Sequence, residues 1–199
     1  MFTASPFYAG RRFADRFGID FDQLFTTVFG SYHEDGDHPW HQVERGEVAL
    51  SAAFGEINRR LADRNYEFEM KDFFAGMRDD IDRSFVQHKV RELKGRGLKM
   101  GVITNNVKEF EAQWKSLMPV DELFDDIVDS SAVGVGKPNP EIYRLALARL
   151  NISKPSAAVF LDDFEPNVVA ARNIGIHGIH VQEDARPALA ELDQMLTSR

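Results

Sequence analysis

The stretch Val159-Phe160-Leu161-Asp162-Asp163-Phe164-Glu165-Pro166-Asn167 decides the fold class of this chain. A short apolar strand, predicted over residues 157–161, ends at two adjacent aspartates, and a helix is expected to follow over 166–174. In open parallel sheets, ligands bind beyond the carboxyl ends of the strands. A helix cap accounts for one aspartate, whereas two adjacent carboxylates at the end of a buried strand repel one another unless a cation is present. Oxygen ligands of this kind favour magnesium.

Helices and strands alternate on both sides of this stretch throughout the second half of the chain. The predicted elements are helix 81–94, strand 98–103, helix 109–117, strand 126–130, helix 140–150, strand 157–161, helix 166–174 and strand 178–181. The strands are apolar on both faces, which indicates a parallel sheet that helices cover on both sides. We therefore expect an α/β fold. His177 and His180 flank the last strand and are interpreted as structural.

The first part of the chain follows a different pattern, and residues 12–80 are predicted to form an all-helical unit. Phenylalanines recur every fourth residue from Phe13 to Phe29, which gives an apolar stripe at helical spacing. Gly18 is interpreted as a helix end, and Asp20 with Gln23 as a capping box that opens the next helix. A polar loop and two further helices are expected at 31–40, 47–65 and 68–77.

The composition limits the classes of function. The chain of 199 residues is 43% hydrophobic and 28% charged, which is typical of soluble globular proteins. Cysteine is absent, which excludes thiolate zinc sites and a cysteine nucleophile and leaves oxygen and nitrogen ligands for a metal. The net charge of −8 argues against nucleic acid or an anionic membrane as a partner. No apolar run is long enough to cross a membrane and signal-peptide zones are lacking, so we expect a cytoplasmic location.

Two further segments carry chemistry near strand ends. Thr104-Asn105-Asn106 follows the first predicted strand and offers a hydroxyl, amides and main-chain N–H groups that suit a phosphate or a carboxylate. A plain helix cap is the alternative. Gly136-Lys137-Pro138-Asn139-Pro140 places a lysine on a turn that proline stiffens, just before a helix. A solvated surface lysine is the alternative there.

In this order and spacing, the three segments resemble the haloacid dehalogenase-like (HAD) hydrolase superfamily over nearly the whole chain. Gly101–Asn106, Gly136–Tyr143 and Val159–Asn167 resemble its second, third and fourth motifs. The branch that contains the phosphatase domain of epoxide hydrolases is the most similar. The resemblance implies a Rossmann-like parallel-sheet core formed by residues 1–11 and 81–199, with residues 12–80 as an inserted helical cap.

The resemblance also implies roles for individual residues. Thr104 and Asn105 would hold the phosphoryl oxygens, and Lys137 would neutralise the nucleophile and the phosphate. Asp163 would coordinate Mg²⁺, and Asp162 would support the site. The implied activity is that of a magnesium-dependent phosphomonoesterase, which acts on a small phosphorylated metabolite through an aspartyl-phosphate.

The first motif of the family, an apolar strand that ends in Asp-x-Asp, is not found in this sequence. Met1–Pro6 looks like the stretch that normally follows it. Asp20-Phe21-Asp22 is better interpreted as a helix cap, and Asp80-Ile81-Asp82 opens a helix. In this fold the missing strand is central, between the strands that end at Thr104 and Asp162. We therefore expect an incomplete amino terminus and no activity for the chain as given.

Several alternatives stay open. Dehalogenation of a small acid uses the same nucleophile without a metal, and a non-catalytic module could bind a phosphorylated metabolite or a protein. A metal cluster in the 31–40 loop is the less favoured alternative to a polar cap loop, and its residues would be His33, Asp35, Asp37, His38 and His41. Trp40 is more readily interpreted as an anchor of that loop than as a stacking surface for substrate.

Overall fold

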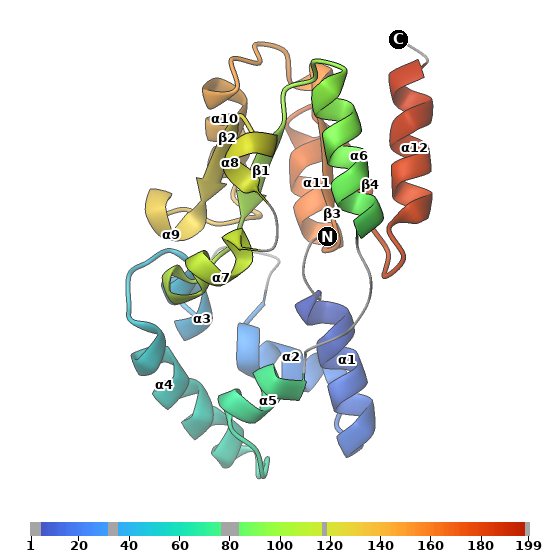
Figure 1. The fold of residues 1–199 in the computed structure, drawn as a ribbon. Coiled ribbons are helices and arrows are strands. Elements are labelled where there is room, and N and C mark those ends of the chain that lie inside the picture. Colours follow the sequence, from blue (N-terminus) through green and yellow to red (C-terminus); the bar gives the residue numbers. More distant parts are fainter. Residues whose placement is uncertain (1–4, 32–35, 77–83, 117–118, 198–199) are drawn as a thin grey trace.

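The computed structural model describes residues 5–31, 36–76, 84–116 and 119–197, which form a helical part and an α/β part (Figure 1). The helical part comprises α1 (Pro6–Phe17), α2 (Phe21–Phe29), α3 (Pro39–Glu44), α4 (Leu50–Asp63) and α5 (Met70–Gly76). The helices of the α/β part are α6 (Ser84–Gly95), α7 (Glu111–Lys115), α8 (Val120–Leu123), α9 (Ser130–Val133), α10 (Pro140–Arg149), α11 (Glu165–Asn173) and α12 (Arg186–Thr197). Its strands are β1 (Gly101–Thr104), β2 (Asp126–Asp129), β3 (Val159–Asp162) and β4 (His177–His180).

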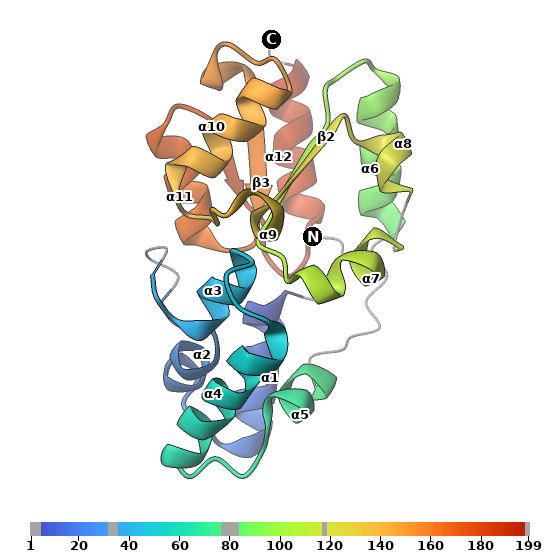
Figure 2. The ribbon, with the colours of Figure 1, turned by 90° about the vertical axis from the view of Figure 1, so that its left-hand side faces the viewer.

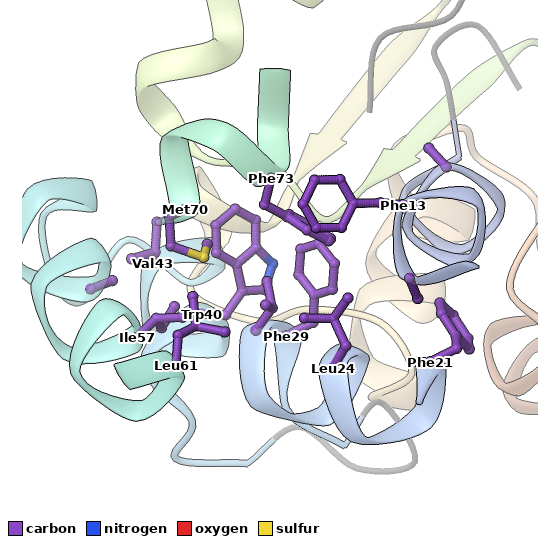
Figure 3. Packing of buried hydrophobic residues seen from close by; sticks show 14 of the residues in the cluster. Phe13, Phe21, Leu24, Phe29, Trp40, Val43, Ile57, Leu61, Met70 and Phe73 are labelled. Carbon is purple, nitrogen blue, oxygen red and sulfur yellow. The ribbon is translucent and has the colours of Figure 1, made fainter. Parts of the chain in front are cut away.

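Aromatic side chains from several helices form the core of the helical part (Figure 3). The Phe13 ring lies 5.1 Å from Phe73, and the Phe29 ring lies 5.2 Å from Trp40, both edge to face. Such pairs contribute about 0.5–1.5 kcal/mol each beyond the area they bury. The predicted stripe from Phe13 to Phe29 is confirmed except at Phe17, which is 55% exposed because it is the last residue of α1.

Local signals set the ends of these first helices as the sequence predicted. Gly18 ends α1 with a φ of 64°, in the left-handed region that glycine adopts without strain. The Asp20 side chain accepts a hydrogen bond from the main-chain N–H of Gln23 at 2.8 Å and so caps α2. Only half of the predicted capping box forms, because the Gln23 side chain accepts a hydrogen bond from Tyr66 instead.

Three parts of the chain differ from the elements predicted for them. The first helix begins at Pro6, because proline fits the first helical turn. Helix α3 begins inside the predicted 31–40 loop, and its Trp40 is 5% exposed and packs on Phe29 and Phe74, which confirms the anchoring role. The predicted helix 109–117 is a 3₁₀ turn, Lys108–Phe110, followed by the short α7. No helix is predicted from the sequence where α8, α9 and α12 lie.

The strands pair in parallel, as expected from the sequence. Gly101 to Thr104 of β1 lie opposite Asp126 to Asp129 of β2. In the same way, β3 pairs with β4, and Asp162 lies opposite His180. The carboxyl ends of the strands point toward the helical part (Figures 1 and 2). The residues that end the strands therefore face α1 and α3.

The sheet is split between β1 and β3. Within the described residues, the strands form two separate pairs, β1–β2 and β3–β4, that share no ladder. The same helices nevertheless cover both pairs: Ile103 of β1 and Phe160 of β3 pack on one cluster with α10 and α11, and α6 contacts both pairs from the other face. The apolar residues of β1 and the first three of β3 are only half-buried. The split lies where the sequence predicted a missing central strand.

The buried imidazole of His38, just before α3, predicts that acid destabilises the helical part. Its Nδ1 accepts a hydrogen bond from Trp40 N at 3.2 Å. Burial, together with the charges of Arg60 and His41, lowers the pKa of His38 to about 4. An unfolded histidine binds a proton near pH 6.5. Stability is therefore present above about pH 6.5 and is lost as the pH falls from there toward about 4.

We expect the variant His38→Asn to remove this loss, because asparagine caps the helix without titrating. Urea unfolding at about pH 7.5 and about pH 5 is the measurement, and the wild type should lose about 1–2 kcal/mol more than the variant between the two. An equal loss in both proteins would contradict a neutral, buried His38.

Candidate functional site

A buried ion pair lies at the carboxyl end of β3. Lys137 Nζ and Asp162 Oδ2 are 2.6 Å apart, and their side chains are 10% and 7% exposed. The other carboxylate oxygen of Asp162 accepts hydrogen bonds from Phe164 N at 2.9 Å and from Asn167 Nδ2 at 3.0 Å. Asp162 is thus occupied on both oxygens, and it fixes the position of the Lys137 ammonium group.

The turn that carries Lys137 is held by the segment after β1. Asn105 Oδ1 accepts a hydrogen bond from Lys137 N at 2.7 Å, and Asn105 Nδ2 donates one to Lys137 O at 2.9 Å. Gly136 allows this approach, since a Cβ there would lie 3.3 Å from both polar atoms of the carboxamide. The Asn105 side chain therefore orients Lys137. What this segment can offer an anion is the half-buried Thr104 hydroxyl together with main-chain N–H groups.

Asp163 follows the ion pair and is half-buried. Burial raises the pKa of Asp163, and several opposing causes, the charge of Lys137 among them, hold it below its usual range. Tyr8 of α1 lies close enough to Asp163 to be affected by its charge. Burial, and after it the charge of Asp163, raise the pKa of Tyr8. His180 contacts the main-chain oxygen of Asp163 at 3.2 Å, which agrees with a structural role.

Sequence reasoning missed a second polar cluster, at the end of β2. Asn106 N donates to Ser130 Oγ at 3.0 Å, and Asn106 Nδ2 donates to Asp129 Oδ2 at 2.7 Å. Ser130 in turn donates to the main-chain oxygen of Glu44, which belongs to the helical part. Asp129-Ser130 could have been found by the rule applied to Asp162-Asp163, because both pairs directly follow a strand. Glu44 carries no such signal.

The candidate metal ligands are few. Within the described residues no group of three or more His, Asp or Glu side chains could hold a metal ion. Because Asp162 is engaged by Lys137, the end of β3 offers the carboxylate of Asp163, and Mg²⁺ prefers several oxygen ligands. Asp163 therefore fits magnesium as one ligand of a set that water, phosphate or a further carboxylate would complete.

The histidine cluster considered from the sequence receives no support from the described part. His38 Nδ1 and His41 Nδ1 each accept a main-chain N–H, from Trp40 and Gly36. His33 and Asp35 lie outside the described residues, as do Asp80-Ile81-Asp82. Asp20-Phe21-Asp22 lies at the start of α2, where Asp20 acts as a cap. None of the helices in the described ranges combines the length and apolar character that a bilayer crossing requires.

Known proteins resemble this chain in sequence. Acyl-CoA dehydrogenase family member 10 of Mus musculus is 29% identical over 176 residues, which are 85% of this chain and 16% of that protein. The sesquiterpene phosphatase astK of Aspergillus oryzae is 26% identical, with 79% of each chain covered. Bifunctional epoxide hydrolase 2 of Mus musculus is 35% identical over 84% of this chain and 32% of that protein. The chain thus spans about a sixth of the acyl-CoA dehydrogenase relative and about a third of the epoxide hydrolase.

Solved structures and a family model complete the comparison. A predicted HAD-like hydrolase from Porphyromonas gingivalis superposes with a TM-score of 0.60 at 20% identity, over 86% of this chain and 87% of that one. A HAD enzyme from Bacteroides thetaiotaomicron, in complex with magnesium and inorganic phosphate, gives 0.59 at 17% identity, over 90% and 86%. These likenesses show the fold. The model of the haloacid dehalogenase-like hydrolases matches residues 9–175, and the chain therefore belongs to that family of hydrolases.

Proposed function

We propose that this chain is the main body of a magnesium-dependent phosphomonoesterase that acts on a small phosphorylated metabolite in the cytoplasm. The observation that carries the proposal is the buried Lys137–Asp162 pair, which Asn105 of the segment after β1 holds in place. An ammonium group fixed at the carboxyl edge of a parallel sheet is suited to bind a phosphate there. Relatives named as phosphatases support a phosphate ester as the substrate class.

Positioned charge would supply most of the catalysis at such a site. A carboxylate nucleophile must approach an anionic phosphate, and a cation about 4 Å from an anion offsets that repulsion by about 4 kcal/mol at an effective dielectric of about 20. In our proposal Lys137 is that cation, and Asp162 keeps it in place. The Thr104 hydroxyl and the main-chain N–H of Asn105 would bind the phosphoryl oxygens.

Asp163 would hold the magnesium ion, which when bound would neutralise phosphate charge and orient the ester. The half-buried position of Asp163 at the end of β3 supports this role, because a hard cation needs carboxylate oxygens. A metal-free dehalogenase would use the same fold, and no observation favours it over the phosphatase.

We infer that the nucleophile is an aspartate on a further strand between β1 and β3. The reaction would proceed through an aspartyl-phosphate on that residue. Strands β1 and β3 have no ladder between them in the described part, and both keep half-buried apolar residues. The carboxyl end of a parallel strand there would lie next to Thr104 and Lys137. The chain as given has no apolar strand that ends in Asp-x-Asp, so we expect it to be inactive; a non-catalytic binding module is the alternative function.

Lys137→Ala should abolish phosphate binding. At a phosphate concentration of about 100 times the dissociation constant, binding stabilises a protein by about 2.7 kcal/mol, which raises the thermal midpoint. The measurement is the shift in midpoint that inorganic phosphate causes in each protein. The variant itself should be less stable by about 3 kcal/mol, because it leaves Asp162 buried without its counter-ion.

Lys154→Ala is the matched control, because Lys154 is an exposed lysine of the same α/β part. It should keep the full phosphate shift of the wild type. Equal shifts in Lys137→Ala and wild type would rule out Lys137 as the anion ligand.

Adding the strand should restore both stability and turnover. The extended protein carries an apolar strand that ends in Asp-x-Asp directly before Phe2, and it is assayed on p-nitrophenyl phosphate with magnesium beside the 199-residue chain. Burying about three apolar side chains should stabilise the fold by about 1.5–3 kcal/mol each. We expect turnover from the extended form alone.

The same extension ending in Asn-x-Asn separates the two effects, since it should stabilise the fold without turnover. Turnover by the 199-residue chain that Asp20→Asn or Asp80→Asn removes would mean that the nucleophile is internal. A folded extended form that remains inert on every phosphate ester tried would favour the binding module.

A further inference from the structure

The carboxyl end of α3 enters the α/β part beside the anion site. Glu44, the last residue of α3, is 7% exposed, and its main-chain oxygen accepts a hydrogen bond from Ser130 of α9. Gly46 follows with a φ of 71°, and a Cβ there would lie 2.6 Å from the Ser131 oxygen. Figure 2 shows α3 directly beneath α9. The two parts are thus in close main-chain contact at this point.

Two N–H donors converge on the Glu44 carboxylate. Trp40 Nε1 donates to Oε1 at 2.8 Å, and Asn105 Nδ2 lies 3.5 Å from Oε2. The indole comes from the helical part and the carboxamide from the segment after β1. Both oxygens of a carboxylate accept hydrogen bonds, so Glu44 satisfies both donors at once. The contact with Asn105 is long, so the Glu44 carboxylate acts there mainly as a negative charge that faces the amide nitrogen.

We propose that Glu44 is a positioning residue: its carboxylate fixes the rotation of the Asn105 carboxamide and, through it, the main chain of Lys137. With Nδ2 toward Glu44, the carboxamide donates to Lys137 O and accepts from Lys137 N. If the carboxamide turned by 180° about its last bond, its oxygen would face Lys137 O and its NH₂ group would face Lys137 N. Both hydrogen bonds to Lys137 would then be lost. The inference rests on the proposed anion site and adds that docking of α3 sets its geometry.

This arrangement couples the helical part to the anion site. If docking of α3 favours the arrangement of Lys137 that binds phosphate, phosphate must favour docking of α3 by the same factor, because such coupling is reciprocal. The coupling passes through two side chains, Glu44 and Asn105. The coupling therefore depends on the two hydrogen-bond-accepting oxygens of the Glu44 side chain rather than on the size of that side chain.

Glu44→Gln tests this directly, because glutamine has the same shape but only one acceptor oxygen. If that oxygen stays on Trp40, the new NH₂ group faces Asn105 Nδ2, and two donors oppose each other. We expect the phosphate dissociation constant, measured by calorimetry on the full chain, to rise about tenfold. Glu47→Gln is the matched control, since Glu47 is an exposed carboxylate that pairs with Arg45, and it should change the constant less than twofold.

A second substitution distinguishes positioning from loss of stability. In a Trp40→Phe background the glutamine is released from the indole and can turn its oxygen toward Asn105. The effect of Glu44→Gln on phosphate affinity should then fall to about threefold or less, although the double variant is less stable than either single one. An undiminished effect in that background would overturn the proposal, and so would an unchanged affinity in Glu44→Gln itself.

Hydrogen exchange of the Lys137 main-chain N–H gives a readout that needs no ligand. This N–H donates to Asn105 Oδ1, so its exchange should be slow in the wild type and in Glu47→Gln, and at least tenfold faster in Glu44→Gln. Unchanged exchange overturns the inference. Absence of phosphate binding in the wild type would overturn the proposed function, and the exchange rates would still decide the role of Glu44.

Discussion

A buried ammonium group must keep a counter-ion, and that requirement joins the separate segments of this site. Lys137 finds its counter-ion in Asp162 at the end of β3, and its main chain is held by Asn105 after β1. Removing one member of such a pair leaves a charge uncompensated in a poorly solvated place. The positions of β1, β3 and the 136–139 turn therefore depend on one another, although they are far apart in the sequence.

The parallel strands direct these groups to one edge, but they leave the sheet incomplete in the described residues. A parallel sheet is normally buried on both faces, with continuous ladders from strand to strand. Here α6, α10 and α11 cover two strand pairs as if they were one sheet, while β1 and β3 each have one side that no strand of the described ranges pairs with. Because the sheet is not continuous, the apolar side chains of β1 and β3 stay half-buried. Their full burial would make the fold more stable.

Periodic and local features were predictable from the sequence. The parallel α/β pattern, helix α10 behind its proline and the cap at Asp20 all follow from spacing and from the chemistry of single residues. The contacts of Lys137 with Asn105 and Asp162 agree with the rule that strand ends share an edge. Contacts between distant segments could not be predicted in this way. Nothing in the sequence around Glu44 indicates that its carboxylate faces Asn105, because that proximity arises only when α3 packs beneath α9.

The contacts between the two parts differ in kind and in strength. Some are polar and lie at exposed positions: Arg12 pairs with Glu183, and Tyr8 with Gln182, where such contacts add about 0–1 kcal/mol each. Apolar contacts join the two parts as well: the aromatic core of the helical part takes in Val107 and Phe110 of the α/β part, and the Phe7 ring lies 6.1 Å from Phe164. The buried junction at Glu44 is different, because parting it would leave the carboxylate, the Ser130 hydroxyl and the Asn105 amide without the partners they have there, and water would have to replace them. Separating the two parts at Glu44 would therefore cost more free energy than breaking a contact at the exposed rim.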